Sequence, residues 1–203
     1  SRVAGFLSKR FAGRLATQLD DSSLLDCLSA AREDIAQAFE LREYARGRIK
    51  TVMLLVNADP EFTAHAIATV KPDVIQFHGS ETPDALARFR AETGIEAWRA
   101  MAVRDAASLA DVAQFRGAAD RVLLDAPASS LPGGNGMAFD WSLLAGWQAP
   151  LAWGLAGGLT PANVGEAIRL TGARLVDTSS GVERSPGIKD VDKITAFCKA
   201  AHI

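Results

Sequence analysis

The sequence predicts an α/β protein of the (β/α)8 TIM barrel class, with residues 1–203 forming a single barrel domain. Two observations lead to this prediction. Short apolar segments alternate with amphipathic segments from residue 49 to the end of the chain, which is typical of a parallel sheet with helical crossovers. The rival class, a doubly wound open sheet that binds a nucleotide, is disfavoured because no GxGxxG fingerprint follows a first strand.

The apolar segments are interpreted as buried parallel strands, since they lack the strict apolar/polar alternation of a half-exposed strand. They span residues 49–57, 72–79, 95–101, 120–126, 151–158 and 173–181. Amphipathic patterns between or after them predict helices over residues 60–70, 83–92, 106–116 and 161–171, and a last helix that contains Val191, Ile194 and Phe197.

Three of these helices share one start signal, a capping side chain followed by proline. The pairs are Asp59-Pro60, Thr82-Pro83 and Thr160-Pro161. The capping oxygen accepts a backbone N–H of the first turn, and proline at the first helical position has no N–H to leave unpaired. We therefore expect a helix to begin at each of these prolines.

The N-terminal part of the chain completes the count of eight βα units. Residues 33–47 predict a helix before the first clear strand. Residues 1–32 have room for two further short strands, near residues 2–6 and 22–27, with a helix between them.

Composition excludes several functional classes. A net charge of −2, without a Lys/Arg run, argues against a nucleic-acid partner. No apolar stretch approaches the roughly 18 residues that span a bilayer, and the N-terminal residues do not resemble a signal peptide. Cys27 and Cys198 form no CxxC pair, and no His/Cys cluster has zinc spacing. We expect a cytoplasmic protein with reduced thiols, no metal site and no membrane contact.

In a TIM barrel the functional site lies at the carboxyl ends of the strands, and the last two loops often bind phosphate. Gly157 and Gly158 follow the seventh predicted strand, while Ser179, Ser180 and Gly181 follow the eighth. Such turns expose backbone N–H groups to an anion. The alternative is that both are only tight turns.

Asp125 ends the apolar segment "RVLLD". A buried carboxyl group at a strand end is a candidate proton donor, because burial disfavours its charged form. Alternatively, Asp125 caps the turn before Pro127. The loop that follows is glycine-rich, which favours a lid over the site; its candidate residues are Gly133, Gly134, Asn135 and Gly136.

Two further residues, one at the end of a predicted strand and one within a strand, are candidates. His78 is either a site residue or a histidine held beneath a turn. Arg99 lies within a predicted strand, and a buried cation needs a partner, which an anionic substrate would provide.

Four segments together resemble the phosphoribosylanthranilate isomerase family over roughly residues 45–200: "IQFHGSETPD", "LLDAPASSLPGGNGMAFDWSLLAG", "LAGGLTPANVGEAIRLTG" and "VDTSSGVERSPGIKD". The resemblance implies a (β/α)8 barrel that acts in tryptophan biosynthesis without a cofactor. It would convert N-(5'-phosphoribosyl)anthranilate into 1-(o-carboxyphenylamino)-1-deoxyribulose 5-phosphate, an Amadori rearrangement. Its partner would be this small phosphosugar, and the chain would be a monomer or homodimer.

The resemblance also implies roles for matching residues. Asp125 falls where the family has the general acid that protonates the furanose ring oxygen. The residues Gly157, Gly158, Ser179, Ser180 and Gly181 fall in the phosphate site, and the loop over residues 133–136 closes over the substrate.

Residues 1–44 depart from the family pattern. The family's first strand carries a cysteine that acts as the general base, and Ala4 stands in its place. An arginine that resembles a recognition group for the anthranilate carboxylate is replaced by Glu33. Three explanations stay open: the chain is an impaired phosphosugar-binding barrel, Cys27 serves as a substitute base, or residues 1–44 as written are not those of the natural protein.

Overall fold

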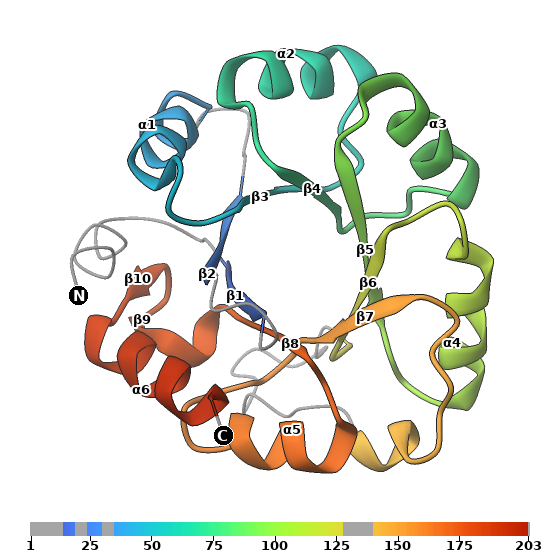
Figure 1. The fold of residues 1–203 in the computed structure, drawn as a ribbon, viewed down its shortest axis with the longest axis vertical. Coiled ribbons are helices and arrows are strands. Elements are labelled where there is room, and N and C mark those ends of the chain that lie inside the picture. Colours follow the sequence, from blue (N-terminus) through green and yellow to red (C-terminus); the bar gives the residue numbers. More distant parts are fainter. Residues whose placement is uncertain (1–13, 19–23, 30–34, 128–139, 203) are drawn as a thin grey trace.

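The computed structural model describes residues 14–18, 24–29, 35–127 and 140–202. Its strands form a closed barrel in the order β1 to β8, and helices lie around the outside of this ring (Figure 1). The predicted TIM barrel class is confirmed, with one departure at β1. None of the described helices is long and apolar enough to span a membrane.

Strands β2 to β8 run parallel to one another around the barrel. All six strands predicted after residue 49 are confirmed, and so is the strand near residues 22–27. The eight barrel strands are β1 (Arg14–Gln18), β2 (Leu24–Ser29), β3 (Thr51–Leu55), β4 (Val74–Phe77), β5 (Glu96–Ala102), β6 (Arg121–Asp125), β7 (Ala152–Leu155) and β8 (Leu175–Thr178).

Strand β1 pairs antiparallel with both β2 and β8. The prediction of a helix before the strand near residues 22–27 is therefore wrong for residues 14–18. The physical reason is the short connection: only residues 19–23 separate β1 from β2, whereas a parallel crossover needs about a dozen residues. The strand expected near residues 2–6, which includes Ala4, lies outside the described residues.

Each helical segment predicted from residue 33 onward contains a helix that covers the barrel, although the one expected over residues 106–116 changes from α to 3-10 geometry at Asp111 and the one expected over residues 161–171 begins later than predicted. The helices are α1 (Ile35–Ala45), α2 (Pro60–Val70), α3 (Pro83–Thr93), α4 (Ala106–Ala110), the 3-10 turns η1 (Asp111–Phe115), η2 (Trp141–Leu144) and η3 (Ser180–Val182), α5 (Val164–Thr171) and α6 (Val191–Ala201). A small hairpin, β9 (Glu183–Ser185) and β10 (Ile188–Lys189), follows η3.

Two of the three predicted helix starts are confirmed. Asp59 Oδ1 accepts a hydrogen bond from the Phe62 amide at 2.8 Å, and the Thr82 hydroxyl accepts one from the Ala85 amide at 3.3 Å. In both helices proline occupies the first turn.

The third predicted start is wrong, because α5 begins at Val164 and not at Pro161. The side chain of Asn163 explains the delay. Its Oδ1 accepts the Thr160 amide at 2.7 Å, and its Nδ2 donates to the Gly158 carbonyl at 3.0 Å. Asn163 thus organises residues 158–163 as a loop, and the helix starts only after it.

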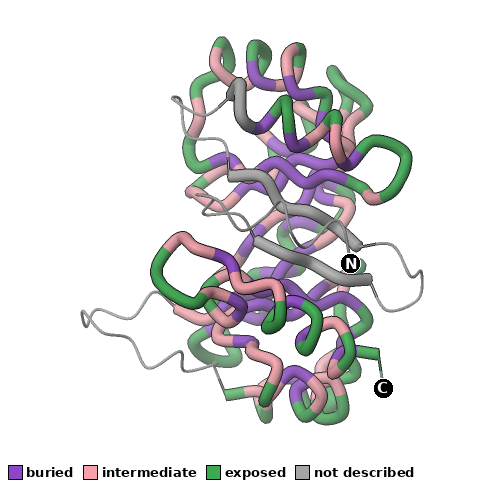
Figure 2. The backbone as a smooth tube through the Cα atoms, turned by 90° about the vertical axis from the view of Figure 1, so that its left-hand side faces the viewer, coloured by how far each residue is buried: buried purple, intermediate pink, exposed green. Residues whose placement is uncertain are grey.

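The barrel interior changes character along its axis. Nearer the amino ends of the strands, the interior is filled by an apolar cluster of Val52, Val74, Trp98, Ala100, Leu123 and Leu175. Two residues further along β4, β6 and β8, on the same strand face, the interior residues are polar: Gln76, Asp125 and Asp177 are all buried. Figure 2 shows the buried segments running through the middle of the molecule. The polar layer lies at the carboxyl ends of the strands and marks the site.

Candidate active site

Asp125 lies at the end of β6 and is 8% exposed. Its Oδ1 accepts a hydrogen bond from the Ala126 amide at 2.8 Å. Its Oδ2 is 3.7 Å from His78 Nε2. The fold therefore brings together the predicted acid and the predicted histidine, which are far apart in the sequence.

The neighbour of His78 on β4 orients its ring. Gln76 Nε2 lies 3.2 Å from His78 Nδ1. An amide nitrogen can only donate, so in this arrangement Nδ1 accepts and the ring hydrogen is on Nε2. That hydrogen is on the ring nitrogen that faces the Asp125 carboxylate.

A cavity of about 620 Å³ opens at this edge of the barrel. This volume is in the range of pockets that bind small molecules. Its lining includes Asp125 and His78, and on the side of β5 and α4 it includes Arg99, Arg104, Ser108 and Asp111. The predicted loop residues Gly133, Gly134, Asn135 and Gly136 lie outside the described residues.

The first predicted phosphate turn lies against the acid. Gly157 and Gly158 both have positive φ, at 81° and 66°. A Cβ on Gly157 would lie 2.2 Å from the Ala126 amide nitrogen and 2.8 Å from Asp125 Oδ1. Only glycine permits this conformation and this close approach, so the backbone after β7 passes directly over the carboxyl group.

The second predicted phosphate turn contacts the first. A Cβ on Gly181 would lie 1.8 Å from the Leu159 carbonyl oxygen. The Thr178 hydroxyl donates to that same oxygen at 2.7 Å. The structure therefore places the two turns side by side, with the first of them against Asp125, while their role in binding phosphate stays a prediction.

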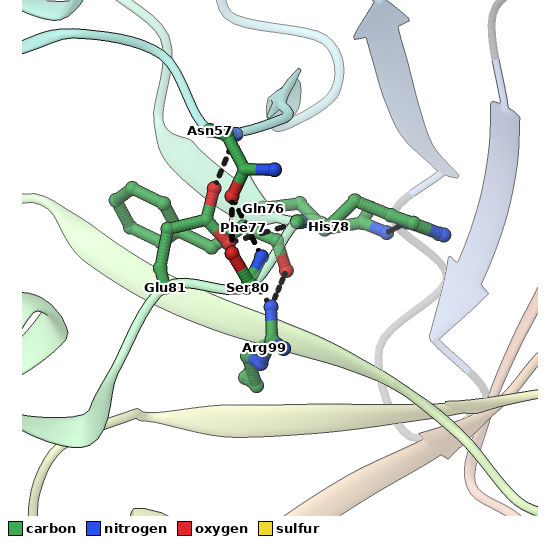
Figure 3. A network of polar contacts seen from close by, with 8 residues as sticks. Asn57, Gln76, Phe77, His78, Ser80, Glu81 and Arg99 are labelled. Carbon is green, nitrogen blue, oxygen red and sulfur yellow. Dashed lines mark hydrogen bonds and ion pairs between the residues drawn. The ribbon is translucent and has the colours of Figure 1, made fainter.

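Arg99 has a partner that the sequence reasoning missed. Its Nη1 donates to Glu81 Oε2 at 3.0 Å and to the Phe77 carbonyl at 3.3 Å, as Figure 3 shows. Its guanidinium also lies over the Phe115 ring, 5.4 Å from the centroid. Burial lowers the pKa of Arg99 because it removes water from the cation, while the nearby Glu81 charge opposes this effect. Within the protein the partner of this cation is Glu81, and the expectation that an anionic substrate pairs with Arg99 stays a prediction.

Glu81 also joins two loops at the top of the barrel. Its Oε1 accepts a hydrogen bond from the backbone N–H of Asn57 at 2.7 Å, and its Oε2 accepts one from the backbone N–H of Gly79 at 2.9 Å. Asn57 Oδ1 in turn accepts the amide and the hydroxyl of Ser80, at 2.7 and 2.9 Å. In Figure 3 these groups surround the turn that follows His78. The network fixes that turn and hence the position of the histidine.

The sequence gives only the place of Glu81 and no sign of its burial. This residue stands three residues after His78 in "HGSETPD", in a loop between a strand end and a helix cap. Lys189, a buried lysine near the second turn, was also missed.

Cys27 lies on β2, in register with Val52 of β3. Its role as a substitute base stays a prediction, and Ala4 and Glu33 lie outside the described residues. Within the described ranges, no group of three or more His, Cys, Asp or Glu side chains could hold a metal ion.

Comparisons with known proteins place this geometry in context. The family model described as N-(5'phosphoribosyl)anthranilate (PRA) isomerase matches residues 20–200. The N-(5'-phosphoribosyl)anthranilate isomerase of Erythrobacter litoralis (strain HTCC2594) is 58% identical over 169 residues, which cover 83% of this chain and 81% of that protein.

Solved structures of the same enzyme family are also similar to this chain. The phosphoribosyl anthranilate isomerase of Thermotoga maritima is similar with a TM-score of 0.74 and 30% identity, covering 86% of this chain and 87% of that chain. A phosphoribosyl anthranilate isomerase in complex with reduced 1-(o-carboxyphenylamino)-1-deoxyribulose 5-phosphate gives a TM-score of 0.71 at 28% identity, with 86% of each chain covered.

Proposed function

Because this chain belongs to the N-(5'-phosphoribosyl)anthranilate isomerase family, we propose that it converts N-(5'-phosphoribosyl)anthranilate into 1-(o-carboxyphenylamino)-1-deoxyribulose 5-phosphate in tryptophan biosynthesis. The observation that carries the proposal is the closeness of Asp125 to the Gly157 turn. An acid beside a phosphate site is what a phosphosugar isomerase needs, because the phosphate anchors the sugar whose ring must be protonated.

Asp125 is the proposed general acid. It gives a proton to the furanose ring oxygen, the bond from that oxygen to C1′ breaks, and the lone pair of the anilino nitrogen forms the C=N bond of the resulting protonated imine. Oδ1 is held by the Ala126 amide, and Oδ2 faces the imidazole of His78. This arrangement supports a role in which the Nε2–H of His78 faces Oδ2 and orients the carboxyl group.

The two turns are the proposed phosphate site. The 3-10 turn η3 makes its own hydrogen bonds through the amides of Val182 and Glu183, which bond to the carbonyls of Ser179 and Ser180. The preceding amides of Ser180 and Gly181, together with those of Gly157 and Gly158, suit a phosphate dianion, which accepts backbone N–H groups without needing a lysine or arginine.

The second half of the reaction removes the C2′ proton of the imine and needs a base. Ala4, at the family's cysteine position, cannot accept a proton. We propose Cys27 as the substitute base, since it lies on the barrel strand β2. The second candidate function is a barrel that binds phosphosugars without turning them over, and the residue that favours it is Ala4.

The remaining features of the proposal are a single (β/α)8 domain, a monomeric or homodimeric state, a cytoplasmic location and a reaction without cofactor or metal. The small phosphosugar is the expected partner, and the net charge of −2 supports the expectation that nucleic acid is not one.

The test is an isomerase assay of the chain as written, following the loss of phosphoribosylanthranilate fluorescence. Turnover that disappears in Cys27→Ser would support the substitute base. A chain without turnover that gains it in Ala4→Cys would support the impaired barrel. If neither the chain nor the Ala4→Cys variant turns over, while both are folded, the proposed activity is wrong.

A further inference from the structure

Lys189 is a buried cation behind the second turn. The residue is 5% exposed and lies at the end of β10. Its ammonium donates to the Ser179 carbonyl at 2.9 Å, to the Ser179 hydroxyl at 3.1 Å and to Glu183 Oε1 at 2.7 Å. An ammonium group has three hydrogens, so these acceptors account for all of its donors. Lysine is rarely buried without such partners, which indicates that this position has a specific role.

We propose that Lys189 is a positioning residue for the phosphate turn, and that it acts on phosphate binding by fixing the Ser179–Ser180 peptide. The inference rests on the proposed phosphate site. It adds Lys189, which lies in the quoted segment "VDTSSGVERSPGIKD" but outside the turn, and to which the sequence analysis assigns no role.

The first step of the argument is the direction of one peptide group. The Ser179 carbonyl points toward Lys189 Nζ and toward the Val182 amide, which donates to it at 3.3 Å. The described residues contain no cis peptide bond. In a planar trans peptide the N–H points opposite to the C=O, so Lys189 directs the Ser180 amide away from itself. That amide is one of the proposed phosphate donors.

The second step concerns the side chain of Ser179. Because Nζ can only donate, the Ser179 oxygen is the acceptor in this contact, and the contact selects the rotamer of the serine. Lys189 thus restrains both the backbone and the side chain of the residue where β8 ends and η3 begins.

The third step concerns charge. Glu183 Oε1 lies 2.7 Å from Nζ, and Glu183 Oε2 accepts the Gly187 amide at 3.1 Å. The side chains of Lys189 and Glu183 are 5% and 12% exposed. The lysine charge is therefore matched within the protein. Its effect on a bound phosphate is expected to come from geometry more than from attraction between the two charges.

The experiment measures binding of ribose 5-phosphate by titration calorimetry to the full chain and to Lys189→Met. The matched control is Lys193→Met, because Lys193 is an exposed lysine whose Nζ donates to the Glu183 carbonyl at 2.6 Å. We expect Lys189→Met to bind at least about tenfold more weakly, the equivalent of one hydrogen bond to a charged group, and the control to bind like the parent chain. In the isomerase assay the same variant should raise KM more than it lowers kcat, whereas a general loss of structure would lower kcat as well.

Equal binding by folded Lys189→Met and by the parent chain would overturn the inference and leave the phosphate site intact. If the parent chain itself does not bind ribose 5-phosphate, the phosphate site is wrong and the inference with it. Should Lys189→Met not fold, Lys189→Gln replaces it, because the shorter, neutral amide has two N–H donors and cannot hold all three acceptors of the lysine. It should then bind more weakly than the parent, and parent-like binding would again contradict the proposal.

Discussion

The strands β3–β5 and the strands β6–β8 hold their polar groups in different ways around the cavity. On the β3–β5 side the Arg99 cation is matched by Glu81, which also accepts two backbone amides. On the β6–β8 side Asp125 lines the cavity and the Gly157 turn lies against its carboxyl group. The ion pair of Lys189 with Glu183 joins β10 to β9 within the hairpin that follows the second turn.

The difference indicates that the β3–β5 side stabilises the fold around the site, while the proposed reaction depends on the β6–β8 side. Charged groups on the β3–β5 side neutralise one another and stabilise the turn that carries His78. The β6–β8 side carries the proposed acid and the backbone amides proposed to bind phosphate. Variants on the first side should therefore lower stability more than ligand binding, whereas every variant on the second side should lower turnover or ligand binding, including those that also lower stability.

The largest effect is expected for Asp125→Asn, because an amide cannot transfer the proton that opens the ring. Turnover should fall by about 10²- to 10⁴-fold, the usual contribution of a general acid. The matched control is Asp111→Asn, since Asp111 is an exposed carboxylate that also lines the cavity. Steady-state kinetics checks both, and an Asp125→Asn enzyme with parent-like kcat would exclude Asp125 as the acid.

The second prediction tests the β3–β5 side. Glu81→Met leaves the Arg99 charge buried without its partner, which should lower the free energy of unfolding by about 3 kcal/mol. Urea unfolding measures this loss. The double variant Arg99→Met with Glu81→Met should lose less than the single one, because no unpaired charge remains. A larger loss in the double variant would show that the pair itself, and not the orphaned cation, governs stability.

The third prediction compares two glycines with positive φ. Gly157→Ala places a Cβ against Ala126 and Asp125, whereas at Gly94 a Cβ would meet nothing within 4 Å. We expect Gly94→Ala to lower the free energy of unfolding by about 1 kcal/mol from backbone strain alone. Gly157→Ala should lower it by about 3 kcal/mol, because overpacking adds to the strain, and should also lower turnover. Equal losses would mean that the turn after β7 can move away from the acid.

The smallest effect concerns the contact between the two turns. Thr178→Val removes the hydrogen bond to the Leu159 carbonyl but keeps the shape of the side chain. The free energy of unfolding should fall by about 1 kcal/mol, and ribose 5-phosphate should bind more weakly. Thr195→Val is the control, since the exposed Thr195 hydroxyl only bonds back to Val191 within α6. Unchanged phosphosugar binding in Thr178→Val would show that the turns act independently.

Most of the barrel could be predicted because its elements carry local signals. Apolar segments gave the strands β3 to β8, and the caps Asp59 and Thr82 gave two helix starts, since both act within one turn of the chain. The Thr160 start failed because the Asn163 side chain bonds to the Thr160 amide and the Gly158 carbonyl and holds this segment as a loop up to Val164. Strand β1 was missed because its place depends on pairing with β2 and β8, which the residues Arg14–Gln18 do not reveal by themselves.

The site residues also divide into those that the sequence could predict and those that it could not. Asp125 and the glycine turns could be predicted because strand ends converge in a barrel. Glu81 and Lys189 could not, because a charged residue in a loop usually indicates solvent exposure, and their burial results from contacts made across the fold.

The central claim is that Asp125 and the two glycine turns bind one phosphosugar together. The most direct measurement is a crystal structure of this chain with reduced 1-(o-carboxyphenylamino)-1-deoxyribulose 5-phosphate. The account predicts a phosphate bound to the amides of residues 157–158 and 180–181, with the Asp125 carboxyl group within hydrogen-bond distance of the sugar chain. A phosphate bound elsewhere, or a sugar chain out of reach of Asp125, would contradict it.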